Sequence, residues 1–186
     1  MDTVPSFFAE NPPPLTLAEA KQAGLEDAAR YFGAMIYGWS FHYDIGDRAR
    51  NIEEKLELTP LGTISVNDPR MILTDIQMND PNMYLWVDYR PEESQLYRIN
   101  KWKAGFVRTA QAYGESPLED KYAALEDAAR TAIRSLLRGN ERNRPKEVSG
   151  FVSLAAFPRY WLNKGQWTTF GRFHVEIREI IPFAAY

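Results

Sequence analysis

The residues best suited to acid–base or metal chemistry in this chain are its two histidines, because the sequence contains no cysteine. His42 and His174 lie in the similar pentapeptides FHYDI and FHVEI. Alternate side chains of a β-strand share a face, so each histidine would lie beside one carboxylate, Asp44 or Glu176. Such a pair could transfer protons, and two pairs on neighbouring strands could hold a metal ion.

The same pentapeptides also have a purely structural interpretation. Their apolar residues would face the core, while the histidine and the carboxylate would face water. No HxH, HxxxH or HExxH spacing favours a metal site. We therefore predict no catalytic residue, no metal and no cofactor, and we retain His42 and His174 as candidate contacts for a ligand.

Aromatic side chains provide a second candidate site. The chain has 10 Tyr, 10 Phe and 5 Trp, which would suit an aromatic-lined groove for a peptide or a sugar. Packing of the core between helices and a sheet would explain the same abundance. The rings considered for such a groove are Trp86, Trp102, Tyr160, Trp161, Trp167 and Tyr186. Trp161 and Trp167 are the candidate ligand-binding residues, and both interpretations stay open.

Basic residues are spaced four apart along a predicted helix and continue beyond its end. They are Arg130, Arg134, Arg138, Arg142, Arg144 and Lys146. This ridge could contact an acidic partner or a phosphate, or it could be a solvated face stabilised by Glu126 and by the helix dipole. No RNP-like motif, zinc finger or helix-turn-helix is present, so we predict a protein partner or acidic surface and no nucleic acid.

Motifs for other kinds of catalysis are missing. The sequence has neither GxGxxG nor GxxxxGK[ST], and it has no GxSxG nucleophile elbow. The absence of cysteine excludes thiolate nucleophiles, iron–sulfur clusters and disulfides. We therefore predict that the protein is not an enzyme.

The hexapeptide LEDAAR occurs twice, at residues 25–30 and 125–130. Each copy lies in an amphipathic pattern that predicts a long helix. Capping boxes are predicted to start these helices, one at Thr16–Glu19 and one at Ser116–Glu119. Residues 16–37 match residues 116–137 at several positions, and duplication of a helix-plus-strands unit and convergence both explain the match.

Most of the remaining chain is predicted to form strands and hairpins. One hairpin is expected around residues 71–90 with its turn at 79–82, and another is expected to turn at residues 163–165. Residues 95–113 are ambiguous: Tyr97 and Ile99 would share one face of a strand, whereas residues 102–112 could be helical.

These elements predict an α+β fold with a mainly antiparallel, curved sheet and two long helices packed on one face. Residues 1–14, with three consecutive prolines, are expected to be an extended arm docked by Phe7 and Phe8. Residues 15–186 would form a single domain, with pseudo-repeats at 15–110 and 115–186 if duplication occurred.

The chain has no run of 18 apolar residues, so we predict no transmembrane segment. Its first residues lack a basic and then an apolar region, so they are not an intact signal peptide. The segments PSFFAENPPP and AEAKQAGLEDAARYFGAMI, within residues 5–40, resemble small bacterial periplasmic or outer-membrane lipoprotein domains, including flagellar-accessory ones. The resemblance implies a periplasmic or outer-membrane-associated location reached through a removed signal, and a cytoplasmic location is the alternative.

Two hypotheses for function follow. The first is a non-enzymatic accessory or interaction module of the bacterial envelope that acts through a protein–protein surface. The alternative is a small-molecule-binding protein or enzyme with a pocket between helices and sheet, in which a histidine supplies the polar contact. The sequence indicates neither the ligand nor the oligomeric state.

Overall fold

The computed structural model describes residues 16–46, 51–79, 82–140 and 145–182. These segments contain three helices and eight strands. In chain order they are α1 (Leu17–Ile36), β1 (Trp39–Asp44), β2 (Lys55–Pro60), β3 (Met71–Asn79), β4 (Asn82–Tyr89), α2 (Glu93–Lys101), β5 (Arg108–Ser116), α3 (Lys121–Asn140), β6 (Pro145–Leu154), β7 (Arg159–Asn163) and β8 (Gln166–Pro182). The predicted arm at residues 1–14, with Phe7 and Phe8, lies outside the described residues.

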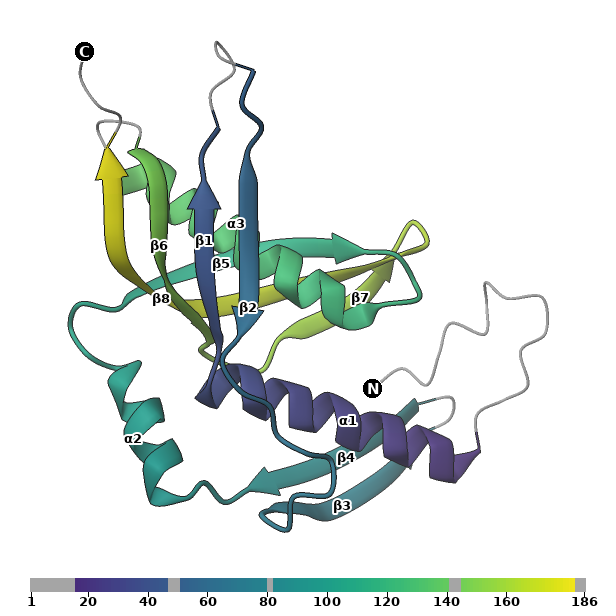
Figure 1. Ribbon diagram of the computed structural model, residues 1–186. Coiled ribbons are helices and arrows are strands. Elements are labelled where there is room, and N and C mark those ends of the chain that lie inside the picture. Colours follow the sequence, from purple (N-terminus) through teal and green to yellow (C-terminus); the bar gives the residue numbers. More distant parts are fainter. Residues whose placement is uncertain (1–15, 47–50, 80–81, 141–144, 183–186) are drawn as a thin grey trace.

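The main sheet is antiparallel and has the strand order β2-β1-β6-β8-β5, with β7 paired to β8. The sheet curves strongly, because the long strand β8 bends between the part that pairs with β6 and the part that pairs with β7 (Figure 1). It does not close on itself. A separate two-stranded sheet is formed by β3 and β4. The predicted α+β class with a mainly antiparallel, curved sheet is confirmed.

Helix α3 covers the inner face of the main sheet, where alternate strand residues are apolar. Trp39 and Phe41 of β1, Val152 of β6 and Phe173 of β8 are each at most 3% exposed. They pack with buried α3 residues, of which Leu125 is fully buried. Burial of each such side chain contributes roughly 1.5–3 kcal/mol, so this layer stabilises the fold substantially.

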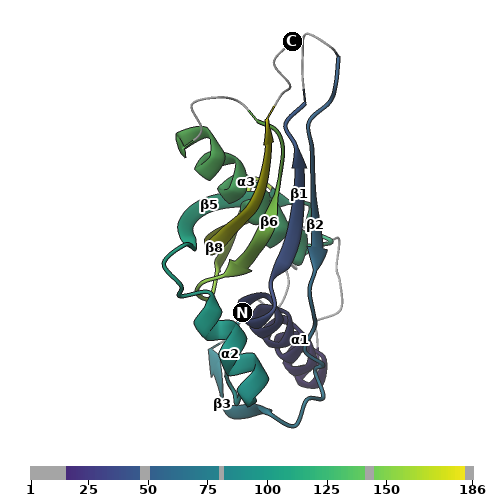
Figure 2. The ribbon, with the colours of Figure 1, turned by 60° about the vertical axis from the view of Figure 1, so that its left-hand side comes forward.

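Helix α1 lies between the end of the main sheet and the β3–β4 hairpin (Figures 1 and 2). Its C-terminal half contributes Ala34, with Tyr31 and Met35 beside it, to the same core that α3 covers. The predicted capping box is present: the Thr16 hydroxyl accepts from the Glu19 amide at 3.2 Å, and the Glu19 carboxylate accepts from the Thr16 amide at 2.8 Å.

A polar network attaches the hairpin and α2 to α1. The Gln95 side chain, 1% exposed, donates to the hydroxyls of Tyr37, the C-cap of α1, and of Tyr89 on β4 at 2.8 and 3.0 Å. The Asp68 carboxylate accepts from the Tyr89 hydroxyl at 3.2 Å and from three nitrogens of Arg70, one of them the backbone amide. Because nearly every donor in this buried cluster has an acceptor, the cluster fixes the hairpin against α1.

Both predicted hairpins are present, whereas the segment left ambiguous at residues 95–113 and the cap at Ser116 differ from the expectations. Tyr97 lies in α2 instead of a strand, and much of the segment at residues 102–112 is strand β5. The capping box expected at Ser116 does not form, because β5 runs to Ser116 and α3 begins at Lys121, with the Asp120 carboxylate accepting from the Ala123 amide at 3.0 Å. Several polar side chains before α3 could cap its N-terminus. Because Ser116 is still part of β5, the later Asp120 caps the helix instead.

Each LEDAAR copy lies in a 20-residue helix. The copies occupy different turns, because Leu25 is in the third turn of α1 and Leu125 is in the second turn of α3. Internal duplication therefore stays a prediction. Among the described segments, no helix is both long and apolar enough to cross a lipid bilayer.

Candidate functional site

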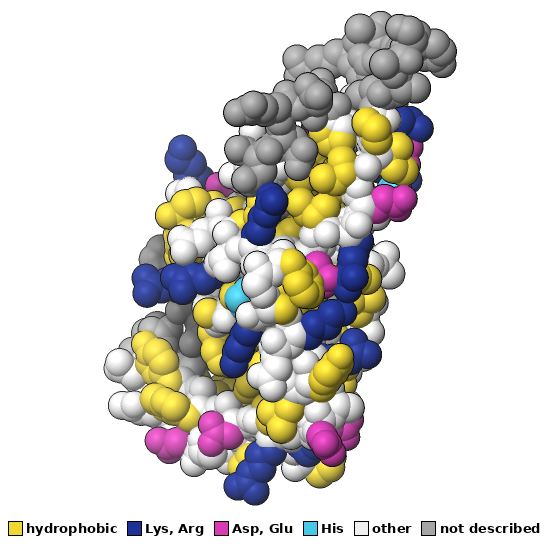
Figure 3. Space-filling model, turned by 90° about the vertical axis from the view of Figure 1, so that its left-hand side faces the viewer, with side chains coloured by type: hydrophobic (Ala, Val, Ile, Leu, Met, Phe, Trp, Pro, Cys, Tyr) yellow, Lys and Arg dark blue, Asp and Glu magenta, His cyan; other side chains and the backbone are white. Residues whose placement is uncertain are grey.

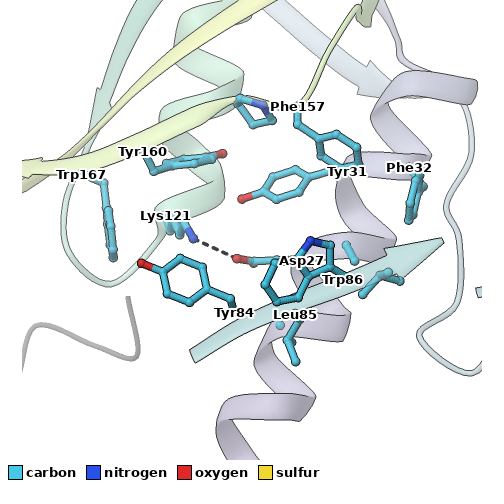
Figure 4. Close-up of a pocket in the computed structure, with 14 residues that line it drawn as sticks. Asp27, Tyr31, Phe32, Tyr84, Leu85, Trp86, Lys121, Phe157, Tyr160 and Trp167 are labelled. Atoms are coloured by element: carbon cyan, nitrogen blue, oxygen red, sulfur yellow. Dashed lines mark hydrogen bonds and ion pairs between the residues drawn. The ribbon is translucent and has the colours of Figure 1, made fainter. Parts of the chain in front are cut away.

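A cavity of about 580 Å³ lies where α1, the β3–β4 hairpin, the start of α3 and the β7–β8 hairpin meet (Figure 4). We call it the aromatic cleft. It is lined by seven aromatic rings and by one acidic and one basic side chain. The lining residues are Gly24, Asp27, Ala28, Tyr31, Phe32, Tyr84, Leu85, Trp86, Val87, Lys121, Phe157, Pro158, Tyr160 and Trp167.

The two charged residues of the aromatic cleft form an ion pair between the long helices. The Lys121 ammonium lies 3.0 Å from a carboxylate oxygen of Asp27, and both side chains are about one-fifth exposed. The same ammonium lies over the rings of Tyr160 and Trp167, 4.7 and 5.3 Å from their centroids. Lys121 therefore has one carboxylate and two π-faces as partners, which suits a partly desolvated cation.

The rings around this ion pair pack in pairs. Tyr31 stacks on Tyr160 at 6.0 Å and meets the edge of Phe157 at 6.3 Å between centroids. On the opposite side Tyr84 and Trp86 of β4 point into the cleft (Figure 4), yet they remain 41% and 45% exposed. One wall is thus packed and the other is open to a ligand, so the cleft resembles the partly apolar, partly polar pockets that bind ligands.

The tyrosine hydroxyls of the packed wall are donors. Burial raises the pKa of Tyr31 and of Tyr160 well above the ordinary value for tyrosine, so both hydroxyls keep their protons at neutral pH. The Tyr160 hydroxyl is buried beside the hydroxyls of Tyr31 and Thr169, which can donate to it, but its own proton has no acceptor among the described atoms. A carbonyl or ether oxygen of a ligand would supply the missing acceptor.

Of the two tryptophans predicted as ligand contacts, the structure places only Trp167 in the aromatic cleft. Trp167 is 6% exposed, and its indole nitrogen donates to the Leu118 carbonyl at 3.0 Å. Trp161 lies on the opposite face of the sheet, where its ring meets the edge of Tyr113 at 6.0 Å. One strand carries both Tyr160 and Trp161, so alternation alone separates them.

The two histidines lie on the outer face of the main sheet and are not brought together. His42 is on β1 and His174 is on β8, with β6 between them. They pair with Ser149 and Ser153 of β6, which places them about 15 Å apart. The predicted alternation of buried and outward-facing side chains in the two pentapeptides is correct, because Phe41 and Phe173, next to the histidines, are buried.

His174 has a setting of its own. It lines a second cavity of about 330 Å³ with Trp102, Lys103 and apolar residues of α1. Its pKa is lowered by burial and, to a smaller extent, by the Lys103 charge. Glu176, expected to share a face with His174, is 2% exposed and pairs with Arg178 at 2.6 Å, so no His–carboxylate pair is found there.

Several residues of the predicted basic ridge are neutralised by carboxylates. Arg130 pairs with Glu126 at 3.2 Å, and Arg134 pairs with Glu54 at 2.5 Å. Lys146 pairs with Glu147 at 2.6 Å, and Arg138 is exposed near the end of α3. Arg142 and Arg144 lie outside the described residues. Elsewhere, on the face shown in Figure 3, Lys and Arg side chains are dispersed among apolar and acidic ones.

The central residues of the aromatic cleft were not predicted from the sequence. Asp27 and Lys121 are 94 positions apart and look like ordinary helix-surface charges. Tyr31 looks like a core residue at helix periodicity. Tyr160 is the exception, because it and Trp86 were among the rings predicted for an aromatic-lined groove. Asp27 lies away from the apolar stripe of its helix, so the sequence pattern carried no signal that singled it out.

Comparison with known proteins shows that the chain is a member of a protein family. One protein-family model matches residues 3–183, almost the whole chain. The chain belongs to that family. A protein of Treponema pallidum (strain Nichols), named only as an uncharacterized protein, is similar to it, with 25% identity over 179 residues that cover 94% of this chain and 72% of the relative. No solved structure matches this family member.

Proposed function

We propose that the protein is a non-enzymatic interaction module that binds an extended, proline- and aromatic-containing peptide of a partner protein in the aromatic cleft. The observation that carries the proposal is the Asp27–Lys121 ion pair ringed by seven aromatic side chains. Grooves lined by aromatic rings bind proline-rich segments, because the rings pack on the pyrrolidines of a preformed extended helix.

The polar groups of the cleft support a peptide as the ligand. An extended peptide presents carbonyl acceptors at regular intervals, and the buried Tyr160 hydroxyl has no acceptor among the described atoms. The open wall, formed by Tyr84 and Trp86, offers apolar area that is still exposed. Burial of two such rings by a ligand would provide several kcal/mol of association free energy before the cost of ordering the peptide.

The same groups give little support to catalysis at this site. The two charged side chains are bound to each other at 3.0 Å, and the raised pKa values of Tyr31 and Tyr160 keep both hydroxyls protonated at neutral pH, so neither can act as a general base. Neither histidine lines the aromatic cleft. A small-molecule ligand remains the alternative occupant, since the cavity volume of about 580 Å³ is also typical of small-molecule sites.

The cellular setting is part of the proposal. We infer a bacterial envelope location from the resemblance of residues 5–40 to periplasmic and outer-membrane lipoprotein domains, and the relative in Treponema pallidum is consistent with a bacterial family. A cytoplasmic location is the alternative. Fractionation of cells that express the full-length gene product, with the mature N-terminus determined by mass spectrometry, distinguishes the two.

The binding test uses the intrinsic fluorescence of the protein and two synthetic peptides. The first peptide has about ten residues, mostly proline, with two phenylalanines, and the second replaces proline by glycine and phenylalanine by alanine. Titration of the full chain is expected to show saturable binding of the first peptide alone. Trp86→Ala, at an exposed position, is expected to weaken binding roughly tenfold or more, because stacked aromatic contacts are typical hot spots.

The matched control is Trp161→Phe, which alters a tryptophan on the opposite face of the sheet and should leave the affinity unchanged. Equal weakening by both variants, or the same affinity for both peptides, would contradict a site in the aromatic cleft. Lys121→Met tests the ion pair separately, and circular dichroism before the titration shows whether that variant is folded. An absence of binding by either peptide to the unsubstituted chain rejects the proposed ligand class.

A further inference from the structure

Three potential metal ligands converge on the outer face of the main sheet, far from the aromatic cleft. They are the imidazole of His42, the carboxylate of Asp44 and the carboxylate of Glu147. One ligand atom from each lies within 4.8 Å of the others. We propose that this cluster binds a divalent transition-metal ion, with zinc as the reference metal.

The strand pairing explains why these three side chains meet. Asp44 of β1 and Glu147 of β6 are direct partners in the antiparallel register, so their side chains are cross-strand neighbours. His42 precedes Asp44 by two residues and shares its face. Two rigid strands of one sheet thus supply all three ligands, which is a favourable basis for a preorganised site.

The spacing suits tetrahedral zinc. Bonds of 2.0–2.2 Å to nitrogen and oxygen place two ligand atoms of a tetrahedral ion about 3.3 Å apart. Nε2 of His42 lies 3.4 Å from a carboxylate oxygen of Asp44, so this edge of the tetrahedron already exists. Rotation of the Glu147 side chain completes three ligands and leaves a fourth position for water, as in open zinc sites.

The charges around the cluster set its affinity. Lys146 bonds to Glu147 at 2.6 Å and must swing away when the ion binds; its side chain is 55% exposed, so this movement is unhindered. Nearby Lys55 is held by Glu57 at 2.6 Å. The exposed ligands and the competing lysine predict micromolar affinity.

The second pentapeptide provides an internal comparison. His174 and Glu176 repeat the spacing of His42 and Asp44 on β8, but Glu176 is bound by Arg178 and His174 faces the second cavity. In register, His174 lies opposite Ser153 on β6 and Thr109 on β5, and neither offers a carboxylate. The same local sequence therefore forms a metal site at one place and none at the other.

Isothermal titration of the full chain with zinc chloride tests the proposal, and absorbance of the cobalt form reports tetrahedral geometry. We expect one site per chain, with affinity reduced about tenfold or more in His42→Ala and in Glu147→Gln, since each removes one of three ligands. His174→Ala is the matched control and should bind zinc as the unsubstituted chain does. Zinc should also raise the melting temperature of the unsubstituted chain but not that of His42→Ala.

Two results would overturn the site. The first is zinc affinity of the unsubstituted chain no tighter than that of His42→Ala. The second is an equal loss in His174→Ala, which would assign the binding to scattered surface histidines. Because Trp86 and Lys121 lie elsewhere, neither result bears on peptide binding in the aromatic cleft.

Discussion

Gly114 on β5 lies directly under Ala128 on α3, so closely that a methyl group at Gly114 would collide with the Ala128 amide and the Ala124 carbonyl. Both obstacles are backbone atoms of a helix and cannot move aside. Gly114→Ala is therefore expected to lower the free energy of unfolding by about 1–3 kcal/mol or more, measured by urea denaturation. Gly105→Ala, where the added methyl group meets nothing within 4 Å, should have little effect.

Asp68 should make stability depend on pH in the acid range. Two hydrogen bonds from Arg70, at 2.9 and 2.7 Å, lower the pKa of Asp68 to about 2. The unfolded chain then binds more protons than the folded one between that value and the ordinary pKa near 4. The stabilisation by this carboxylate is therefore present above pH 4 and lost as the pH falls toward 2.

Thermal unfolding of the unsubstituted chain and of Asp68→Asn across this range checks the prediction. Asp68→Asn is expected to be less stable at neutral pH and to lose less stability on acidification. Asp88→Asn, at an exposed position of β4, should retain the acid dependence of the unsubstituted chain. A curve for Asp68→Asn parallel to that of the unsubstituted chain would show that Asp68 is not the responsible group.

His174 should titrate below the ordinary histidine range. Burial, with a smaller effect of Lys103, lowers the pKa of His174 in the folded chain. Below about pH 6.5 the unfolded state binds the proton more readily, so the folded state loses stability as the pH falls through the window below that value. NMR titration of the imidazole resonances should give a His174 pKa under 6.5, and His174→Gln should flatten the stability curve there. A pKa at or above 6.5 would be inconsistent with its burial.

Two substitutions in the β7–β8 turn should change the free energy of unfolding in opposite directions. Lys164 and Gly165 have φ values of 49° and 78°, the left-handed pair of a two-residue hairpin loop. Lys164→Asn should increase the free energy of unfolding by up to about 1 kcal/mol, because asparagine tolerates this region. Gly165→Ala should decrease it by about 1 kcal/mol with no steric clash, since its methyl group would meet nothing within 4 Å. Effects of the same sign in urea denaturation would refute this explanation.

The two LEDAAR copies show what sequence patterns could and could not predict here. Both were correctly predicted as helix, because the apolar period and Ala content act locally. Their aspartates, however, have different roles: Asp27 binds Lys121 of the other helix, whereas Asp127 accepts from the Glu115 amide of β5 at 3.1 Å. Identical neighbours in sequence cannot distinguish these roles, because tertiary packing supplies the partner.

The same limit applies to the two candidate sites. Periodicity placed Phe41 and Phe173 in the core and His42 on the outer face. It could not supply Glu147, which reaches His42 only through the pairing of β1 with β6. Helix α2 was missed because it is only nine residues long and its Tyr97 and Ile99 also fit the alternation of a strand.

The position of β8 in the chain has a consequence for biosynthesis. This 17-residue strand pairs with β5, β6 and β7, all of which precede it. While the ribosome is still adding β8, those three strands expose unmatched edges, and the contacts that join them span long stretches of sequence. Strands β2, β1 and β6 can pair beforehand, but β5 and β7 can join the main sheet only after β8 has left the exit tunnel. During that interval we expect the nascent chain to be most prone to aggregation.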